Sequence, residues 1–264
     1  MKETEVRFLS KPKLKSPIVI EGLPGIGLVG KIAADHLIAK TKAKKFCELY
    51  SPYFPPQVIT DSRGVVRLVK NDFYYLSEKD DNGNGRDFIL LGGDYQGMSP
   101  ESQYEITGKI LDVLEQFKPK IIYTLGGLGT GKIVKSPKVY AATNNEKLIA
   151  SHEKHGLIFR DREGGGIFGA SGLLLGLGKL RGIDAVCLMG ETVGQVVDAK
   201  AAKILLEKLS KILKLKVDMK DLEDHARRTE RELEKIKKLQ DEQAKALQMA
   251  MVQSSDEDIM RYIR

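Results

Sequence analysis

The sequence EGLPGIGLVGK, residues 21–31, decides how the first part of this chain is expected to fold. It follows a short apolar segment, residues 17–20, typical of a strand, and it opens a segment with helical character that reaches Ile38. Gly25, Gly27 and Gly30 have the spacing G-x-G-x-x-G, which brings backbone N–H groups close to a ligand at a helix N-terminus. The same glycines could serve strand-to-helix packing alone, so the spacing leaves both functions open.

Outward from this turn, strand-like and helix-like segments alternate through most of the chain. This alternation predicts an α/β fold with a mainly parallel sheet covered by helices on both faces. Further strand patterns are at residues 44–50, 88–91, 121–125, 139–142 and 185–189. Further helix patterns are at residues 99–117, 145–155, 168–180 and 195–213. A separate small antiparallel meander is expected from residues 58–60, 65–69 and 73–76.

Length and composition permit one full α/β domain with an appendage, since the chain has 264 residues, of which 42% are hydrophobic. The net charge of +7 is spread through mixed Lys/Glu runs, which argues against nucleic-acid binding and leaves an acidic protein partner open. Without an apolar signal core or a run long enough to span a bilayer, we expect a cytoplasmic protein with no membrane partner. Cys47 and Cys187 lie in apolar strand-like segments and are expected to be buried free thiols.

Two glycine-rich segments are tested as nucleotide-binding loops. A dinucleotide site at Gly25 would need an acid about 20 residues further on, and Glu48 has about that position, although Leu23 and Pro24 are not part of that fingerprint. The segment 126–132 has the spacing G-x-x-x-x-G-K, but Ile133 stands where magnesium binding needs Ser or Thr. No helix pattern follows, so an ordinary ATPase loop is excluded, whereas anion binding on backbone amides stays open.

No pattern in the sequence indicates a catalytic centre, a metal site or a cofactor. The four histidines form no H-E-x-x-H or compact ligand set, and Ser171 lacks the elbow G-x-S-x-G. Glu191 ends the last strand pattern and is the best single carboxylate candidate for ligand binding, with helix capping as the alternative. The resulting alternative function is a nucleotide- or nucleoside-binding enzyme, with a cleft lined by Gly25, Gly27, Gly126, Gly127 and Glu191.

The composition changes after Leu215. Residues 218–248 are rich in Glu, Lys, Arg and Gln and contain no Gly or Pro. Alternating three- and four-residue steps form an imperfect heptad seam, which favours a long helix packed on a partner helix. A surface helix lying back on its own domain is the alternative. We expect an α/β domain at residues 1–216, a long helix at 217–252 and a flexible tail at 253–264.

Several segments together resemble a known family. These are residues 21–30 (EGLPGIGLVG), 125–127 (LGG), 171–176 (SGLLLG) and 188–192 (LMGET), in that order and spacing. They resemble the archaeal branch of the proteasome assembly chaperone 2 family, as does the stretch 198–202 with the Leu pair that follows it. The likeness covers about residues 10–215 and is more specific than any one glycine motif.

The resemblance implies a Rossmann-like α/β domain, related in shape to nucleoside phosphorylases but without an established catalytic set. It also implies a non-enzymatic homo-oligomer, a tetramer being one such assembly, that assists or activates the proteasome core particle without ATP. Some archaeal members end in a docking tail with a hydrophobic residue, a penultimate Tyr and any last residue. Here Tyr262 is antepenultimate and Ile263 penultimate, so the expected docking residues are Met260, Tyr262, Ile263 and Arg264.

Overall fold

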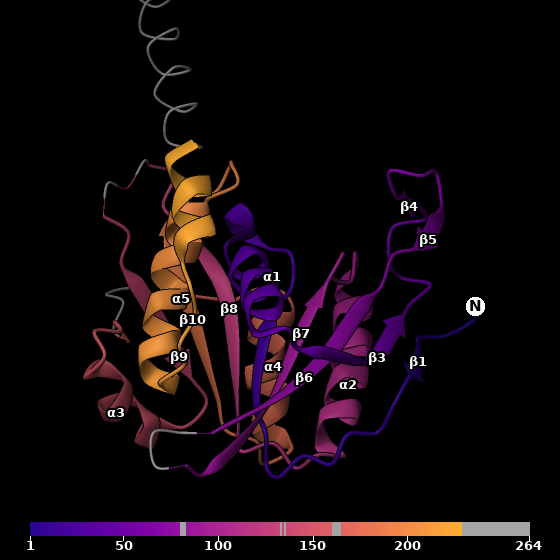
Figure 1. Cartoon of the computed structure of the whole chain (residues 1–264), viewed down its shortest axis with the longest axis horizontal. Coiled ribbons are helices and arrows are strands. Elements are labelled where there is room, and N and C mark those ends of the chain that lie inside the picture. The colour runs from indigo at the N-terminus through magenta and orange to yellow at the C-terminus, as the bar shows by residue number, and fades with distance from the viewer. Residues whose placement is uncertain (80–82, 133, 135, 160–164, 229–264) are drawn as a thin grey trace, which may run out of the picture.

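An eight-stranded mixed sheet forms the centre of the computed structural model, which describes residues 1–79, 83–132, 134, 136–159 and 165–228 (Figure 1). The strand order is β1-β3-β6-β7-β2-β8-β10-β9. The four strands β7, β2, β8 and β10 are parallel to one another, and the remaining strands pair antiparallel on either side of them. The strands are β1 (Glu5–Phe8), β2 (Ile18–Gly22), β3 (Lys44–Tyr50), β6 (Asn71–Lys79), β7 (Gly85–Gly93), β8 (Ile121–Gly129), β9 (Val139–Thr143) and β10 (Ala185–Thr192).

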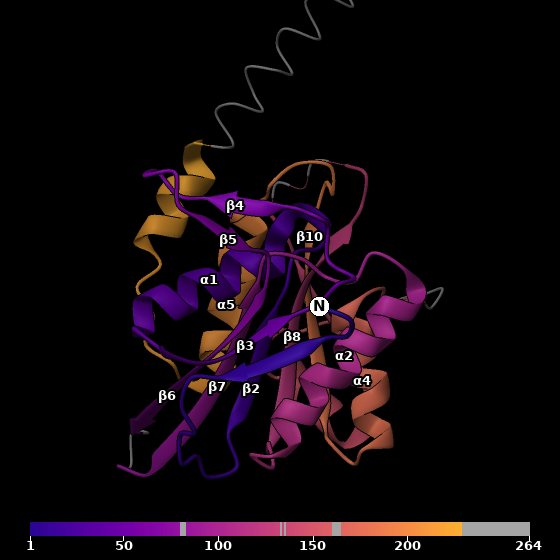
Figure 2. The same cartoon turned by 90° about the vertical axis from the view of Figure 1, so that its right-hand side faces the viewer.

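Helices cover both faces of this sheet, which confirms the predicted α/β class (Figure 2). One face carries α1 (Val29–Thr41) and α5 (Ala199–Leu213), and the other carries α2 (Pro100–Glu115) and α4 (Ala170–Leu180). The short helices are η1 (Ile26–Leu28), η2 (Glu146–Leu148) and α3 (Ile149–Glu153). Neighbouring residues of β2 contribute to the two separate cores, Ile20 on the α1 side and Val19 on the α2 side. This two-sided burial explains why the strand is apolar without alternation.

Side-chain caps determine where two of these helices begin. Ser99 accepts a hydrogen bond from the Ser102 backbone N–H, and Ser102 accepts one from the Ser99 N–H, so α2 begins near the predicted residue. The carboxylate of Asp198 accepts from the Ala201 N–H at 2.9 Å. Helix α5 therefore begins at Ala199 and not at Gln195 as predicted, because the capping residue has a non-helical backbone.

The predicted three-stranded meander is wrong. Strands β4 (Val58–Thr60) and β5 (Val66–Leu68) pair with each other as a hairpin, whereas β6 lies in the main sheet between β3 and β7. Strand β6 pairs along its whole length with β7, and Phe73 is buried in the core on the α2 side. The extra hydrophobic burial therefore favours the main sheet over a separate meander.

The chain after α5 packs back on its own domain. Residues 220–228 are helical, and both Leu222 and Ala226 are buried. Lys40 of α1 forms ion pairs with Asp218 and Asp221, and the His36 Nε2 lies 2.7 Å from the Asp218 carbonyl oxygen. The start of the predicted long helix thus lies against α1. The rest of its heptad seam and the tail at 253–264 lie outside the described residues.

Both cysteines are buried and free, as predicted. The buried environment raises the pKa of the Cys47 and Cys187 thiols to about 12, because desolvation disfavours the thiolate. Neither thiol is therefore a ready nucleophile. In the parts of the chain that the structure describes, no helix is both long and apolar enough to cross a bilayer.

Candidate functional site

A cleft of about 390 Å³ lies at the carboxyl ends of β2, β8 and β10. Its walls are the turn after β2, the end of β8, the loop after β7, the first turn of α2 and the start of α4. Strand β2 leads into α1 on one face of the sheet, whereas the adjacent β7 leads into α2 on the other face. Neighbouring strands whose connections leave in opposite directions form the crevice where α/β proteins bind ligands.

Some glycines around the cleft are required by close packing. A Cβ on Gly30 would lie 2.0 Å from the Leu125 carbonyl oxygen, and one on Gly127 would lie 2.3 Å from the Ile26 carbonyl oxygen. Gly27 has a φ of +61°, and its Cβ would lie 2.9 Å from the Thr192 hydroxyl oxygen. Gly27 and Gly30 therefore let the turn and α1 approach the sheet, which was one of the two functions that the spacing left open.

Two other glycines are not required by close packing. The nearest atom to a Cβ on Gly25 would be the Gln96 Nε2, at 3.8 Å. For Gly126 the nearest atoms would be the Met189 Cγ and the Ser171 Oγ, both at 4.0 Å. These are ordinary van der Waals distances, so packing does not require glycine at either position. Both residues line the cleft.

Gln96 holds three walls of the cleft together. Its Nε2 donates to the Pro24 carbonyl oxygen at 2.6 Å, and its Oε1 accepts from the Ala170 N–H at 2.8 Å. Gly169 has a φ of +79°, and a Cβ there would lie 2.3 Å from the Gln96 Oε1. One amide side chain thus links the loop after β7 to the turn after β2 and to the start of α4, which preforms the cleft.

A buried carboxyl group lies behind this cleft. Glu21, in β2, is fully buried, and its Oε1 accepts from the Leu23 N–H at 2.8 Å. Its Oε2 accepts from the hydroxyl of Ser171, a residue that lines the cleft, at 3.1 Å. Burial raises the pKa of Glu21 to about 7, although these hydrogen bonds oppose the rise. The sequence analysis missed Glu21; the signal was an acid that directly follows an apolar strand and precedes the glycine turn.

The described lining of the cleft carries no formal charge. Among the described residues that line it there is no Lys, Arg, His, Asp or Glu. Gln103 is a lining residue whose Nε2 donates to the Gly97 carbonyl oxygen at 2.6 Å. Its Oε1 is buried and has no hydrogen-bond partner in the described part of the chain. This acceptor lies below the accessible surface, so a ligand N–H or O–H would reach it only after a movement of the Gln103 side chain.

The structure places the predicted cleft residues in two groups. Gly25, Gly126 and Gly127 line the cleft, whereas Gly27 and Glu191 are not among its lining residues. The Glu191 Oε2 accepts from the Lys138 N–H at 2.8 Å, so this carboxylate holds the segment before β9. The predicted docking residues Met260, Tyr262, Ile263 and Arg264 lie outside the described residues.

Neither nucleotide-loop pattern has the required structural context. Glu48 is in β3, which β6 and β7 separate from β2, and its carboxylate is bound by Lys70 and Tyr50. The dinucleotide interpretation is wrong, because this acid would have to follow the strand next to the glycine turn. Residues 126–129 continue β8 as extended strand and do not form a loop before a helix. Among the described residues no cluster of His, Cys, Asp and Glu could hold a metal ion.

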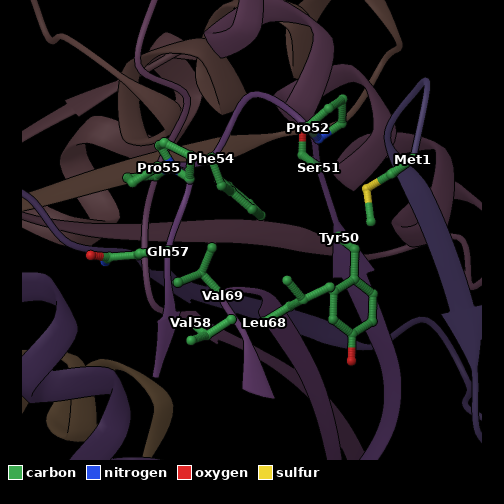
Figure 3. A pocket seen from close by; sticks show the side chains of 11 residues that line it. Met1, Tyr50, Ser51, Pro52, Phe54, Pro55, Gln57, Val58, Leu68 and Val69 are labelled. Carbon is green, nitrogen blue, oxygen red and sulfur yellow. The ribbon is translucent and has the colours of Figure 1, made fainter. Parts of the chain in front are cut away.

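A second hollow, of about 610 Å³, lies beside the β4–β5 hairpin and the loop after β3 (Figure 3). Tyr50, Phe54, Val58 and Leu68 are among its lining residues. Cross-strand pairing puts Val58, Leu68 and Val66 on one face of the hairpin, where their exposed fractions are 50%, 52% and 59%. We call this the hairpin face; three half-exposed aliphatic side chains in one small patch are typical of an interaction surface.

The opposite side of the hairpin attaches it to the domain. Arg67 donates to both carboxylate oxygens of Asp94, with an Nη2–Oδ1 distance of 3.0 Å. The Lys70 N–H also donates to Asp94, at 3.0 Å, and Ile59 packs against the core on the α2 side. These contacts hold the hairpin in place while Val58, Val66 and Leu68 stay half-exposed.

The mixed sheet, its two helical layers and the glycine turn after the first parallel strand define a Rossmann-like α/β protein. The chain belongs to the PAC2 family, whose model matches residues 19–237. The domain is similar to PbaB of Pyrococcus furiosus, described as an archaeal proteasome activator. The identity is 46%, the TM-score is 0.85, and the match covers 90% of this chain and 100% of that one.

Two further relatives are also archaeal. PbaA of Pyrococcus furiosus, described as an archaeal homolog of proteasome-assembly chaperone, is 26% identical with a TM-score of 0.73, covering 94% of this chain and 97% of that one. An uncharacterised protein of Methanocaldococcus jannaschii is 40% identical over 95% of this chain and 93% of its own length. The resemblance inferred from the sequence motifs is therefore confirmed at the level of the family.

Proposed function

We propose that this protein is a non-enzymatic, cytoplasmic partner of the proteasome core particle that acts as an assembly chaperone or ATP-independent activator. The observation that carries this proposal is the similarity to PbaB, which extends over the whole of that chain. The similarity to PbaA supports the same class of partner. The cleft supports a non-enzymatic function, because its described lining residues include no general base or acid, and neither cysteine is accessible.

The C-terminal tail is the docking element in this proposal. The ring of Tyr262 would enter a pocket on the core particle, Met260 and Ile263 would add apolar contact, and the carboxylate of Arg264 would meet a basic group. One such tail binds weakly. Several tails on one oligomer bind together, because the first attachment raises the effective concentration of the others.

Self-association is the second part of the proposal, and the hairpin face supports it. The charges of the hairpin are already paired, Arg63 with Asp61 and Arg67 with Asp94. Two copies related by a twofold axis would therefore bring apolar side chains together without juxtaposing unpaired like charges. A tetramer is one assembly that such a contact permits, provided that a second interface joins the dimers.

A pull-down with purified archaeal core particle tests the docking mechanism. The full chain is compared with a chain that ends at Ile259 and with a control whose last five residues are the same ones in scrambled order. We expect the full chain to bind and both altered chains to lose binding. Equal binding by all three would contradict tail docking and move the interface to the domain, whereas binding by none would contradict the proteasome proposal itself.

The alternative function, a nucleotide- or nucleoside-binding enzyme, has the position of the cleft in its favour. Its described lining offers no cationic side chain to a phosphate group, which argues against nucleotides. A ligand that binds the native state must raise its stability. A flat unfolding midpoint across AMP, ATP and inorganic phosphate would exclude the nucleotide form of this alternative.

A further inference from the structure

We propose that the cleft at the ends of β2, β8 and β10 binds an uncharged, largely apolar small molecule that carries an N–H or O–H donor. This site lies in the α/β domain, apart from the tail that carries the docking proposal. The inference therefore does not depend on proteasome binding, and either one can fail without the other.

The first reason is that the cleft contains a volume that no side chain of the described residues fills. Gly25 and Gly126 lack a side chain although the nearest atoms to an added Cβ are 3.8 Å and 4.0 Å away. Elsewhere in the same turn, glycines such as Gly30 are enforced by backbone contact. Gln96 fixes the surrounding walls through two hydrogen bonds, so the space does not depend on a ligand to form it. A preformed concave site of this kind is the usual form of a ligand pocket.

The second reason is the chemistry of the wall. Leu23, Ile26, Leu125, Ile167 and Met189 supply apolar surface. No described lining residue ionises at neutral pH, since burial raises the pKa of the Cys187 thiol to about 12. A phosphate or carboxylate would lose its hydration here without gaining a cationic partner among the described lining residues. The volume of 390 Å³ corresponds to about a dozen water molecules and lies at the lower end of the range for ligand pockets. The wall therefore selects a small neutral molecule.

The third reason is that two lining residues, Gln103 and Ser171, carry oxygen atoms that can accept a further hydrogen bond. The Gln103 Oε1 is buried and unpaired in the described part of the chain. Ser171 also lines the cleft, and its hydroxyl donates to Glu21, so its oxygen can still accept a hydrogen bond. An unsatisfied buried acceptor is costly, so a side-chain movement that brings the Gln103 Oε1 to a ligand N–H or O–H would satisfy a group that the described fold leaves unpaired.

Methyl NMR of the protein labelled with ε-¹³C-methionine tests this inference directly. Met189 lines the cleft, and Met219 packs in the core on the α1 side and serves as an internal control. The probes are indole, which is neutral, aromatic and carries one N–H, and 1-methylindole, which lacks that donor. We expect indole to shift the Met189 signal in a saturable way while Met219 stays in place. Losing one hydrogen bond should weaken 1-methylindole about 10-fold.

Four variants separate a ligand site from a general effect. Gly126→Leu fills the cleft and should abolish the indole shift, and Gly126→Ala should weaken it if the larger variant does not fold. Gly176→Ala lies in α4 where an added Cβ meets no atom within 4 Å, and it should leave the shift unchanged. Gln103→Leu removes the unpaired acceptor and should reduce the preference for indole over 1-methylindole to about 1-fold.

Four results would overturn the inference. The first is a Met189 signal that neither indole nor 1-methylindole moves. The second is an equal indole shift in the wild type and in Gly126→Leu. The third is a saturable shift caused by inorganic phosphate or AMP in place of the neutral probes, which would assign the cleft to an anion. The fourth is an undiminished preference for indole in Gln103→Leu.

Discussion

The cleft and the hairpin face differ in how many parts of the chain build them. Segments from several strands and helices line the cleft, whereas one short hairpin carries the hairpin face. The cleft is enclosed by strand ends, and Gln96 ties its walls together above a buried Glu21. The hairpin face belongs to two three-residue strands that pair with each other and project from the edge of the domain (Figure 1). The difference indicates that the cleft suits a small molecule, whereas the hairpin face suits the surface of another protein.

The largest expected effect comes from disturbing the close contact between α1 and β8 beside the cleft. Gly30→Ala puts a Cβ 2.0 Å from the Leu125 carbonyl oxygen, a backbone atom in the sheet that cannot move aside. We expect a loss of about 4 kcal/mol or more in the free energy of unfolding. The matched change in the hairpin is Gly64→Ala, where an added Cβ meets no atom within 4 Å but φ is +83°. Its cost should be about 1 kcal/mol. Urea unfolding of both variants measures the difference. Equal losses in the free energy of unfolding would show that the contact between α1 and β8 is no more sensitive to an added Cβ than the hairpin.

A second large effect concerns the proton on Glu21. Its pKa in the folded protein is raised to about 7 from the ordinary value of 4.5, so the folded state binds the proton more tightly than the unfolded state. The stabilisation from this proton is fully present below about pH 4.5 and is lost as the pH rises through about 7. Glu21→Gln keeps the shape and removes the ionisation.

We expect Glu21→Gln to be more stable than the wild type at pH 8, by up to about 3 kcal/mol, and to approach it at pH 4. Denaturant unfolding of both proteins between pH 4 and 8 measures this directly. A constant difference between Glu21→Gln and the wild type across this range would show that Glu21 does not titrate there.

An intermediate effect is expected from releasing the hairpin. Arg67→Ala removes the paired hydrogen bonds to Asp94, but the Arg67 side chain is 46% exposed, so solvent weakens this ion pair. The global cost should be about 1 kcal/mol or less. Hydrogen exchange of residues 58–68 should accelerate while exchange in β8 stays unchanged. Arg63→Ala, whose ion pair lies within the turn, is the control, and unchanged exchange in Arg67→Ala would show that Asp94 does not hold the hairpin.

The smallest effect on the folded chain, and the largest on self-association, is expected from the hairpin face. Val66 and Leu68 are half-exposed, so Val66→Lys with Leu68→Lys should change the free energy of unfolding by no more than about 0.5 kcal/mol per site. The added charges would repel one another in a twofold contact. Sedimentation should show a smaller species than the wild type. An unchanged mass would exclude the hairpin face from the interface, and Leu180→Lys, a change at another exposed apolar residue, is the control.

Much of the fold could be predicted from local patterns. The apolar segment 44–50 is β3 with the expected bounds, and Ser99-Pro100 marks the start of α2, because caps and apolar runs are encoded within a few residues. Strand β1 was not predicted, since its burial alternates in a charged segment at the sheet edge. The place of β6 was mistaken, because short antiparallel strands look alike whether they pair locally or join a larger sheet.

The site was predicted in part. The glycine turn and the end of β8 were expected at one edge of the sheet, and Gly25, Gly126 and Gly127 do line one cleft. Gln103 was missed because it lies in no pattern. Glu21 was missed although it opens the glycine turn, because its importance follows from burial between distant segments. Glu48 was considered for a dinucleotide site on sequence distance alone, and in the sheet two strands, β6 and β7, separate its strand from β2.

By itself, the sequence determined the α/β class, the turn at residues 21–31 and membership of the PAC2 family, because short-range patterns of apolar residues, glycines and caps specify local backbone structure. Only the tertiary structure decided which glycines serve packing and which leave a cleft open, since that depends on atoms from other strands and helices within 4 Å. It also decided that Glu21 is buried with a pKa of about 7, because desolvation is a property of the assembled core and not of the residue.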